Sequence, residues 1–343
     1  MTAPARCNLI TDVAGIRVGN AQDADLLSGV TVILPDEAAV AAVDARGGAP
    51  ASRETDALDP SCLVDAIHGV VLSGGSVFGL DAASGVTHWL AERKRGFSFR
   101  AQPKVCPVVS AANLFDVTNG GNKDWGDPPP YRALGIKACE AAGSDFALGN
   151  AGAGMGALAG RYKGGLGSAS DVWNGVTVGA LVAVNSFGSP VVPGTDVLWA
   201  APFEKHREFG GTGDLKFTVD EASQSLEADT KTALMRSAAD TGQNTTIGVI
   251  ATDAKITPAE ARRIAIMATD GMARALRPVH TPFDGDIVFV LATGAVELCD
   301  ARPMALAMIG ALAADVMARA IGRSVWEAET VGGWHSYRDI HGK

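Results

Sequence analysis

The chain is most sharply patterned after residue 244, where strand-like and helix-like segments alternate twice. Residues 246–251 form an apolar, β-branched run that is typical of a strand. The next segment opens with Thr257-Pro258-Ala259-Glu260, a capping box with proline at the first helical position, and predicts a helix to about Leu276. Residues 286–291 predict a second strand, and residues 305–321, apolar on most faces, predict a buried helix. Any fold for this chain must accommodate the order strand, helix, strand, helix.

The part of the chain before residue 244 is rich in glycine. Its glycines, most of the 41 in the chain, stand among apolar residues, which indicates tight turns and close backbone approaches, not disorder. Strands are predicted in AGIRVGNA, in SGVTVILP and over residues 68–72 and 176–185, and helices over residues 77–95 and in YRALGIKACEAAG. From about residue 191 to 243 the sequence turns polar, and we expect a surface excursion and mobile linker that ends at Asn244.

Charge and composition argue against several classes of protein. A net charge of −9 without a basic stripe disfavours a nucleic-acid partner, because phosphate binding needs clustered Lys and Arg. MTAPARCNLI lacks the apolar core of a signal sequence, and no uninterrupted apolar stretch approaches the ~18 residues of a membrane span. The 5 cysteines lack a CxxC pattern, so we expect reduced cytoplasmic thiols, each serving as a small buried hydrophobic residue. The 6 histidines show no metal-ligand spacing, and neither a metal nor a cofactor is expected.

Asn244, Thr245 and Thr246 stand at the entry to the first strand after the polar stretch, and they allow three interpretations. They match a glycosylation acceptor, but that use requires secretion. They are also an ordinary strand entry, since β-branched residues favour strands, and taken alone the letters favour this interpretation. The third interpretation is a peptide bond that the protein cuts in itself.

Self-cleavage would solve a chemical problem for Thr245. A threonine hydroxyl is a poor nucleophile unless a base lies beside it, and the residue's own α-amine becomes such a base once the preceding bond is cut. The Thr245 hydroxyl would attack the Asn244 carbonyl, and the resulting ester would hydrolyse. This chemistry requires a polar stretch before the threonine and a rigid strand after it, and the sequence has both.

Other polar residues could complete such a site. Asp284 and Asp286 flank Gly285 before an apolar strand, so both carboxylates point the same way and could orient an amine or share a proton; the alternative is a solvated Asp-Gly turn. His280 is the one histidine close to this acidic pair. A lysine such as Lys163 lowers the pKa of a nearby nucleophile, and the amide of Asn185, at a strand end, can donate to an oxyanion. Alone, each of these two is more often a surface lysine and a turn asparagine.

One motif points to a different class of function. Residues 154–159 match the G-x-G-x-x-A pattern of dinucleotide-binding proteins, which makes nucleotide binding an alternative hypothesis. The segment before the motif makes a poor strand, and no acidic residue follows in the right context. The pattern therefore predicts nucleotide binding only weakly.

Several long blocks together resemble the DmpA-like (P1) family of self-cleaving N-terminal-nucleophile hydrolases. The family includes L-aminopeptidase/D-esterases, β-peptidyl aminopeptidases, a pantetheine-cleaving amidase and nylon-oligomer hydrolases. The resemblance covers nearly the whole chain, in the blocks DVAGIRVGNA, DARGGAPASRETDALDP, LSGGSVFGLDAASGVTHWL, GNAGAGMGALAG, YKGGLGSAS, TVGALVAVN and NTTIGVIATDAKIT. Blocks of this length in the right order are more specific than any single motif.

The resemblance implies a role for each candidate residue. Thr245 would be the nucleophile and Asn244–Thr245 the processed bond, which divides one domain of residues 1–343 into residues 1–244 and 245–343. Asn185 would hold the oxyanion, and Lys163 would lie near the nucleophile, with Arg161 as the alternative in that alignment. Asp284 and Asp286 would hold the amine and hydroxyl of Thr245. The fold implied is α/β, a four-layer αββα sandwich.

The resemblance also implies a class of substrate and an assembly. Asp-Gly-Asp together with Asn-Thr-Thr is more similar to the nylon-oligomer hydrolases and the pantetheine amidase, so the predicted reaction is hydrolysis of linear amides. The alternative is an L-aminopeptidase/D-esterase or β-peptidyl aminopeptidase that acts on free N-terminal amines. We expect a small-molecule or oligomeric amide substrate, a homotetramer of cleaved protomers, a cytoplasmic location, and neither a nucleic acid nor a membrane as partner.

Overall fold

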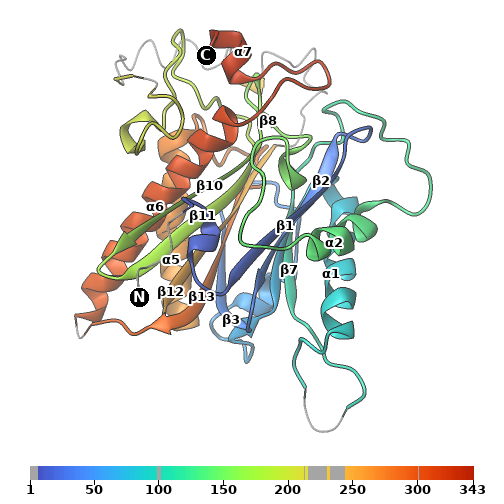
Figure 1. Ribbon diagram of the computed structural model, residues 1–343, viewed down its shortest axis with the longest axis vertical. Coiled ribbons are helices and arrows are strands. Elements are labelled where there is room, and N and C mark those ends of the chain that lie inside the picture. The colour runs from blue at the N-terminus through green and yellow to red at the C-terminus, as the bar shows by residue number, and fades with distance from the viewer. Residues whose placement is uncertain (1–6, 99–101, 212, 215–229, 232–243, 300) are drawn as a thin grey trace.

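Two β-sheets lie face to face, and helices cover their outer faces, in the computed structural model of the protein (Figure 1). The structure describes residues 7–98, 102–211, 213–214, 230–231, 244–299 and 301–343. Both sheets are mixed, because each contains one parallel pair of strands, β6 with β7 in the first sheet and β12 with β13 in the second.

The strands of each sheet follow one another in a fixed order. The order in the first sheet is β1 (Ile16–Asp23), β2 (Ser28–Pro35), β6 (Gly69–Ser73), β7 (Val109–Asn113) and β4 (Ser52–Arg53). The order in the second sheet is β10 (Leu166–Trp173), β11 (Val176–Asn185), β12 (Thr245–Ala254), β13 (Ile287–Val296), β3 (Ala39–Ala45) and β5 (Ala66–Ile67). A small hairpin is formed by β8 (Leu158–Ala159) and β9 (Tyr162–Lys163).

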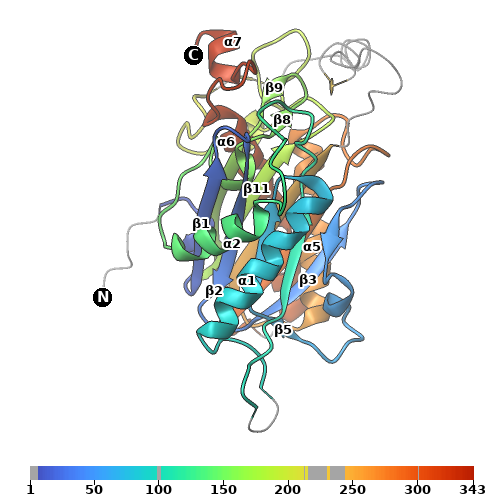
Figure 2. The ribbon, with the colours of Figure 1, turned by 90° about the vertical axis from the view of Figure 1, so that its right-hand side faces the viewer.

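The helices form the two outer layers. Figure 2 shows α1 (Asp81–Glu92) and α2 (Tyr131–Glu140) lying over the first sheet. The second sheet is covered by α5 (Pro258–Ala275) and α6 (Arg302–Trp326), which pack on each other, and α7 (Tyr337–His341) follows near the C-terminus. The expected α/β fold, a four-layer αββα sandwich, is therefore confirmed.

Alternation along the strands explains the layers. In β12, Ile247 and Val249 point into the core between the sheets, whereas Ile250 packs against the layer of α5 and α6. Successive side chains of a strand point to opposite faces, so a strand buried on both faces must be apolar throughout. All ten residues of β12 are buried, as are all ten of its neighbour β11, so side chains on β12 are well shielded from solvent.

Most predicted elements are confirmed with small shifts of their ends. The capping box at Thr257 forms: the Glu260 backbone N–H donates to Thr257 Oγ1 (3.3 Å), and the Thr257 backbone N–H donates to Glu260 Oε2 (2.8 Å). The helix predicted over residues 77–95 is shorter, because residues Ser76–Leu80 form a 3-10 turn and α1 begins at Asp81.

The prediction of a surface linker over residues 191–243 holds only in part among the described residues, because Lys205, His206 and Arg207 are exposed but other residues are buried. Leu198, Ala200 and Phe209 are buried in the core beneath the α5 and α6 layer, and Lys231 is buried as well. Single apolar residues that reach the core are scattered among the polar residues of this stretch. They show no periodic pattern in the sequence. Residues 212, 215–229 and 232–243 lie outside the described residues.

The expectation that every cysteine is buried is also wrong. Cys139, on α2, is buried, whereas Cys7, Cys62, Cys106 and Cys299 are exposed, and all five are free thiols. The sequence pattern could not separate these cases, because the exposed cysteines lie outside the regular helices and strands.

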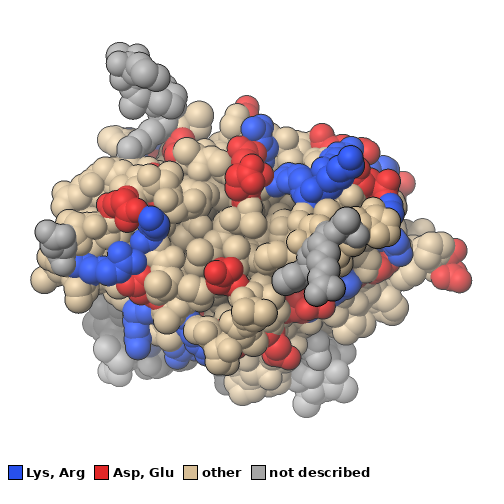
Figure 3. Space-filling model, turned by 90° about the horizontal axis from the view of Figure 1, so that it is seen from below, with Lys and Arg blue, Asp and Glu red and all other residues tan. Residues whose placement is uncertain are grey.

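The surface and one helix bear on the expected partners. Figure 3 shows that acidic and basic side chains are interspersed on the lower face of the molecule. By length and mean hydropathy, α6 is the one helix among the described residues that could cross a membrane. It packs against α5, β10 and β11 with most of its apolar window buried, which is typical of a core helix.

Candidate active site

Thr245 is the first residue of β12, and its position in the sheet is fixed on both sides. It pairs with Asn185 at the end of β11, and β12 runs parallel to β13 on the other side. By alternation Thr245 shares the inward face of Ile247, whereas Thr246 points to the opposite face. The two adjacent threonines therefore lie in different environments.

The peptide bond before Thr245 is held by backbone hydrogen bonds from the turn that precedes β13. The Asn244 N–H donates to Phe283 O (2.8 Å), and the Gly285 N–H donates to Asn244 O (2.7 Å). The Thr245 hydroxyl contacts the same carbonyl oxygen. A carbonyl that accepts a fixed backbone N–H is polarised, and the hydroxyl beside it is placed for attack on the carbonyl carbon.

Gly285 leaves the space that this arrangement needs. A Cβ on this residue would lie 2.8 Å from Thr245 Oγ1 and 2.7 Å from Ala49 O. Real side chains do not approach so closely, so the position accepts only glycine without displacement of the hydroxyl. The glycine between Asp284 and Asp286 thus leaves room for the Thr245 hydroxyl.

Both carboxylates of the acidic pair are buried, so the alternative of a solvated turn is excluded. Asp284 Oδ1 accepts from the Phe187 N–H (3.1 Å), and Asp284 Oδ2 accepts from the Thr281 N–H (3.0 Å) and hydroxyl (2.5 Å). Asp286 Oδ1 accepts from the Thr246 N–H (2.7 Å). Burial, and to a lesser extent the negative charge of Asp286, raises the pKa of Asp284.

The contacts of Asn185 fix the direction of its amide. Oδ1 accepts hydrogen bonds from Leu158 N (2.9 Å), Asn119 Nδ2 (3.0 Å) and Lys231 Nζ (3.0 Å). A backbone N–H and an ammonium can only donate, so this atom must be the oxygen. Nδ2 donates one hydrogen to Phe115 O (3.0 Å), which leaves its second hydrogen as the donor that an oxyanion would use.

Lys163 is buried, and its ammonium is committed to backbone carbonyls. Nζ donates to Gly154 O (2.9 Å), Ala157 O (3.0 Å) and Gly164 O (2.6 Å), which accounts for all its hydrogens. Burial lowers its pKa to about 7, and the charge of Asp116 opposes that shift. Lys163 therefore holds the turn whose Leu158 N–H contacts Asn185, and its expected role beside the nucleophile stays a prediction. Arg161, the alternative, is exposed and stacks over the Tyr162 ring.

Two residues that contact the Asn185 side chain were not predicted from the sequence. Asn119 lies in a loop and donates to Gly156 O (2.9 Å) as well as to Asn185. Lys231 donates to Asn185 O (3.2 Å) and Oδ1, and burial lowers its pKa to about 7. Neither residue carries a sequence signal, because the first is an ordinary turn asparagine by its neighbours and the second stands in a polar stretch.

The remaining predicted features fall into place around this cluster. His280 lies against Asp286, with Nδ1 2.8 Å from Oδ2. Residues 154–159 follow a 3-10 turn that ends at Gly154 and enter the short strand β8, so the dinucleotide pattern lacks the helix N-terminus on which it depends.

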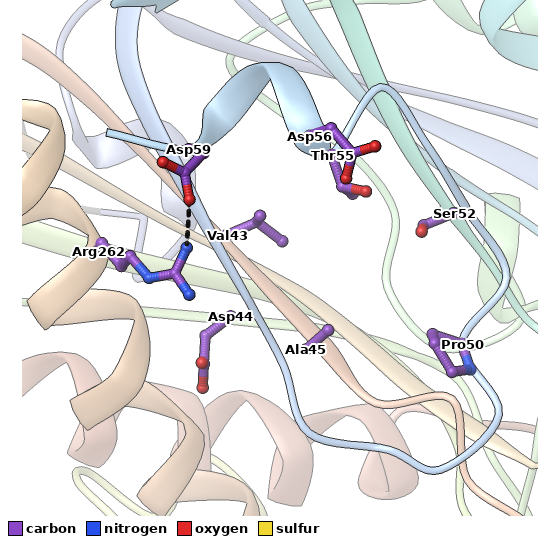
Figure 4. Close-up of a pocket in the computed structure, with 9 residues that line it drawn as sticks. All are labelled: Val43, Asp44, Ala45, Pro50, Ser52, Thr55, Asp56, Asp59 and Arg262. Atoms are coloured by element: carbon purple, nitrogen blue, oxygen red, sulfur yellow. Dashed lines mark ion pairs between the residues drawn. The ribbon is translucent and has the colours of Figure 1, made fainter. Parts of the chain in front are cut away.

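A pocket of about 330 Å³ opens between the end of β3, the loop after it and α5 (Figure 4). Its lining is mostly polar and comes from the end of β3, the loop after it and α5: Val43, Asp44, Ala45, Pro50, Ser52, Thr55, Asp56, Asp59 and Arg262. Pro50 Cα lies 3.3 Å, and Thr245 Oγ1 2.8 Å, from the point that a Cβ on Gly285 would occupy. Pro50, one of the residues that line the pocket, is thus close to the Thr245 hydroxyl.

Known proteins match this chain over most of its length. The model of peptidase family S58 matches residues 8–338. An uncharacterized aminopeptidase of Mycobacterium tuberculosis is 45% identical over 351 residues, covering 97% of this chain and 98% of the relative. A 6-aminohexanoate-oligomer endohydrolase of Kocuria sp. is 30% identical over 294 residues, covering 84% and 75%.

Solved structures show the same fold at low identity. The L-aminopeptidase D-Ala-esterase/amidase of Ochrobactrum anthropi, a variant of the Ntn hydrolase fold, matches with a TM-score of 0.68 at 22% identity, covering 95% of this chain and 88% of that chain. A β-aminopeptidase of Burkholderia sp. matches with a TM-score of 0.65, also at 22% identity, covering 98% and 92%. The family match and the relatives together identify an amide hydrolase: this chain belongs to peptidase family S58.

Proposed function

We propose that the protein cuts its own Asn244–Thr245 bond and then hydrolyses amides through Thr245. The contact of the Thr245 hydroxyl with the Asn244 carbonyl, which the Gly285 N–H holds at 2.7 Å, carries this proposal. In the first stage the hydroxyl oxygen attacks the Asn244 carbonyl carbon, and the C–N bond breaks as its nitrogen takes the hydroxyl proton. Water then hydrolyses the ester and leaves a carboxylate on Asn244 and a free amine on Thr245.

In the second stage the free amine acts as the base for its own hydroxyl. The amine takes the hydroxyl proton, and the oxygen attacks the substrate carbonyl. Asn185 Nδ2 donates its second hydrogen to the oxyanion, and the buried carboxylates of Asp284 and Asp286 hold the ammonium. The leaving amine departs with a proton, and water releases the acyl group from Thr245.

For the substrate, we favour a peptide or amino-acid amide with a free N-terminal amine. Relatives named aminopeptidases are 45% identical over nearly the whole chain, whereas those named 6-aminohexanoate-oligomer endohydrolases are 29–30% identical over 84% of it. This support is stronger for the alternative raised in the sequence analysis than for the linear amides predicted there.

Linear amides remain the second candidate because of two aromatic rings near the site. Phe187 and Phe283 lie with ring centroids 5.6 Å apart, and their backbones bond to Asp284 and Asn244. Phe283 is 38% exposed. An apolar methylene chain could lie on this pair of rings, which gives a linear oligomer a surface to bind.

The experiment begins with the intact mass of freshly purified protein under denaturing conditions. We expect two masses, for residues 1–244 and 245–343, and one full-length mass for Thr245→Ala, which should also lack hydrolysis. A processed and fully active Thr245→Ala protein would refute the proposal. Comparing a free-amine amide with its N-blocked counterpart then separates the substrates: loss of turnover on blocking indicates an aminopeptidase.

Assembly and location belong to the same proposal. We propose the homotetramer of cleaved protomers that the resemblance to the DmpA-like family implies, and the cytoplasmic location expected from the dispersed cysteines. Analytical ultracentrifugation of the processed protein measures the assembly directly, and a monomer at micromolar concentration would contradict it.

A further inference from the structure

His280 connects the buried acidic pair to the surface of the protein. Its imidazole is 22% exposed, whereas the Asp286 side chain beside it is 1% exposed. The backbone of His280 has φ +54°, in the left-handed region that non-glycine residues seldom adopt. This conformation turns both the backbone N–H and the ring of one residue towards a single carboxylate.

The hydrogen bonds of Asp286 divide between its two oxygens. Oδ2 accepts from the His280 N–H (3.0 Å) and lies 2.8 Å from His280 Nδ1, whereas Oδ1 accepts from the Thr246 N–H (2.7 Å). An ionised carboxylate only accepts hydrogen bonds, so Nδ1 carries the hydrogen when Asp286 is charged. The plane of the carboxylate is therefore fixed from one side by His280 and from the other by the strand that begins with Thr245.

We propose that His280 is a positioning residue for the nucleophile: its ring holds Asp286 so that the carboxylate faces the α-ammonium of Thr245 during turnover. The inference rests on the proposed function, because that ammonium exists only after Asn244–Thr245 is cut. His280 itself need not touch the substrate. It acts through Asp286, and the Thr246 N–H contact shows how near that carboxylate lies to the new N-terminus.

The ring contributes what the backbone cannot. Without the imidazole, Oδ2 keeps only the His280 N–H, and the carboxylate can turn about its Cβ–Cγ bond. A charge-assisted hydrogen bond in a buried place is among the stronger kinds, so its loss should be visible in the rate. The effect should fall on kcat, since the Thr245 ammonium forms as the hydroxyl is deprotonated and not when substrate binds.

Two substitutions separate positioning from folding. His280→Gly removes the ring and at the same time relieves the left-handed backbone, so backbone strain cannot explain a loss of activity. His280→Asn tolerates the same backbone conformation and places an amide N–H near the position of Nδ1. His88→Asn, at an exposed position on α1, is the matched control.

The experiment measures kcat and KM of fully processed protein, verified by intact mass, on the amide that the wild type hydrolyses best. We expect His280→Gly to lower kcat about 10- to 100-fold with KM nearly unchanged, and His280→Asn to recover most of the loss. Wild-type kcat in His280→Gly, or an equal loss in His280→Asn, would overturn the positioning role and leave the proposed function standing. A wild-type protein that is neither cut nor active would overturn both.

Discussion

Two adjacent threonines begin β12, and only one of them faces the candidate site. Thr245 shares the inward face with Ile247, whereas Thr246 faces the layer of α5 and α6, where its hydroxyl is buried without a hydrogen-bond partner among the described residues. The sequence alone could predict the acidic pair and the strand after the threonines. It could not predict Asn119 or Lys231, because their contacts with Asn185 join segments far apart in the chain.

The different faces of the two threonines predict opposite results for one substitution. Thr245→Val should block cleavage, because it removes the hydroxyl beside Asn244 O. Thr246→Val should leave cleavage intact and stabilise the fold by about 1 kcal/mol, because it removes a buried, unpaired polar group of similar shape. Intact mass and denaturant unfolding measure the two effects. Cleavage in Thr245→Val, or loss of cleavage in Thr246→Val, would show that Thr245 is not the nucleophile.

Gly285 supplies a steric test at the same scale. Gly285→Ala places a methyl group 2.8 Å from Thr245 Oγ1 and 2.7 Å from Ala49 O, so either the hydroxyl or the loop must move. We expect processing to slow at least tenfold, which corresponds to a rise of about 1.4 kcal/mol in the activation free energy of cleavage. Gly143→Ala is the control, since its nearest neighbour would be 3.7 Å away. Processing of Gly285→Ala at the wild-type rate, measured by intact mass over time, would contradict this steric explanation.

At the scale of the elements, the best predicted part of the chain follows Thr245. The segments that became β12, α5, β13 and α6 combine a clear period with explicit start signals, and their order was correct. The strand pairing of the first sheet had no such signal: β6 lies beside β7 in parallel, and β4, only two residues long, joins the far edge. Short strands and long-range pairing depend on packing, which a local pattern does not contain.

The capping box of α5 predicts an effect on stability without one on chemistry. Thr257→Ala removes the oxygen that accepts the Glu260 N–H and should lower the free energy of unfolding by about 1 kcal/mol. Thr257→Ser keeps that oxygen and should be close to wild type. Denaturant unfolding of the three proteins checks the difference, and kcat should be the same in all. If Thr257→Ala lowered kcat without lowering the free energy of unfolding, this end of α5 would belong to the active site.

At the scale of the whole molecule, the two proposed pieces share one core. The piece from residue 245 onward contributes β12 and β13 to the middle of the second sheet, with β11 on one side and β3 on the other. Separating the pieces would expose the core on both faces of that sheet. Processed protein should therefore keep both pieces together in native solution and release them only on denaturation.

The buried ammonium of Lys163 predicts how stability depends on pH. Burial lowers its pKa in the folded protein to about 7 from the ordinary value of 10.5, so above pH 7 the unfolded chain binds the proton more tightly. The contribution of Lys163 to the unfolding free energy should therefore rise as pH increases from 7 to 10.5 and become constant below pH 7.

Comparison with Lys163→Met isolates this group, because the other titrating residues are common to both proteins. The stability of the wild type relative to the variant should increase between pH 7 and pH 9 in denaturant unfolding. A difference that stays constant over that window would mean that Lys163 keeps an ordinary pKa when folded.

The carbonyl of Asn244 is held by the Gly285 N–H, which comes from the turn just before β13. Synthesis of the chain reaches that turn some forty residues after Thr245 has been added, and β13 comes later still. Under the proposed mechanism, a growing chain on the ribosome holds an inert threonine until the last strand of the sheet has been made. The order of translation thus delays self-cleavage until the turn before β13 has been made.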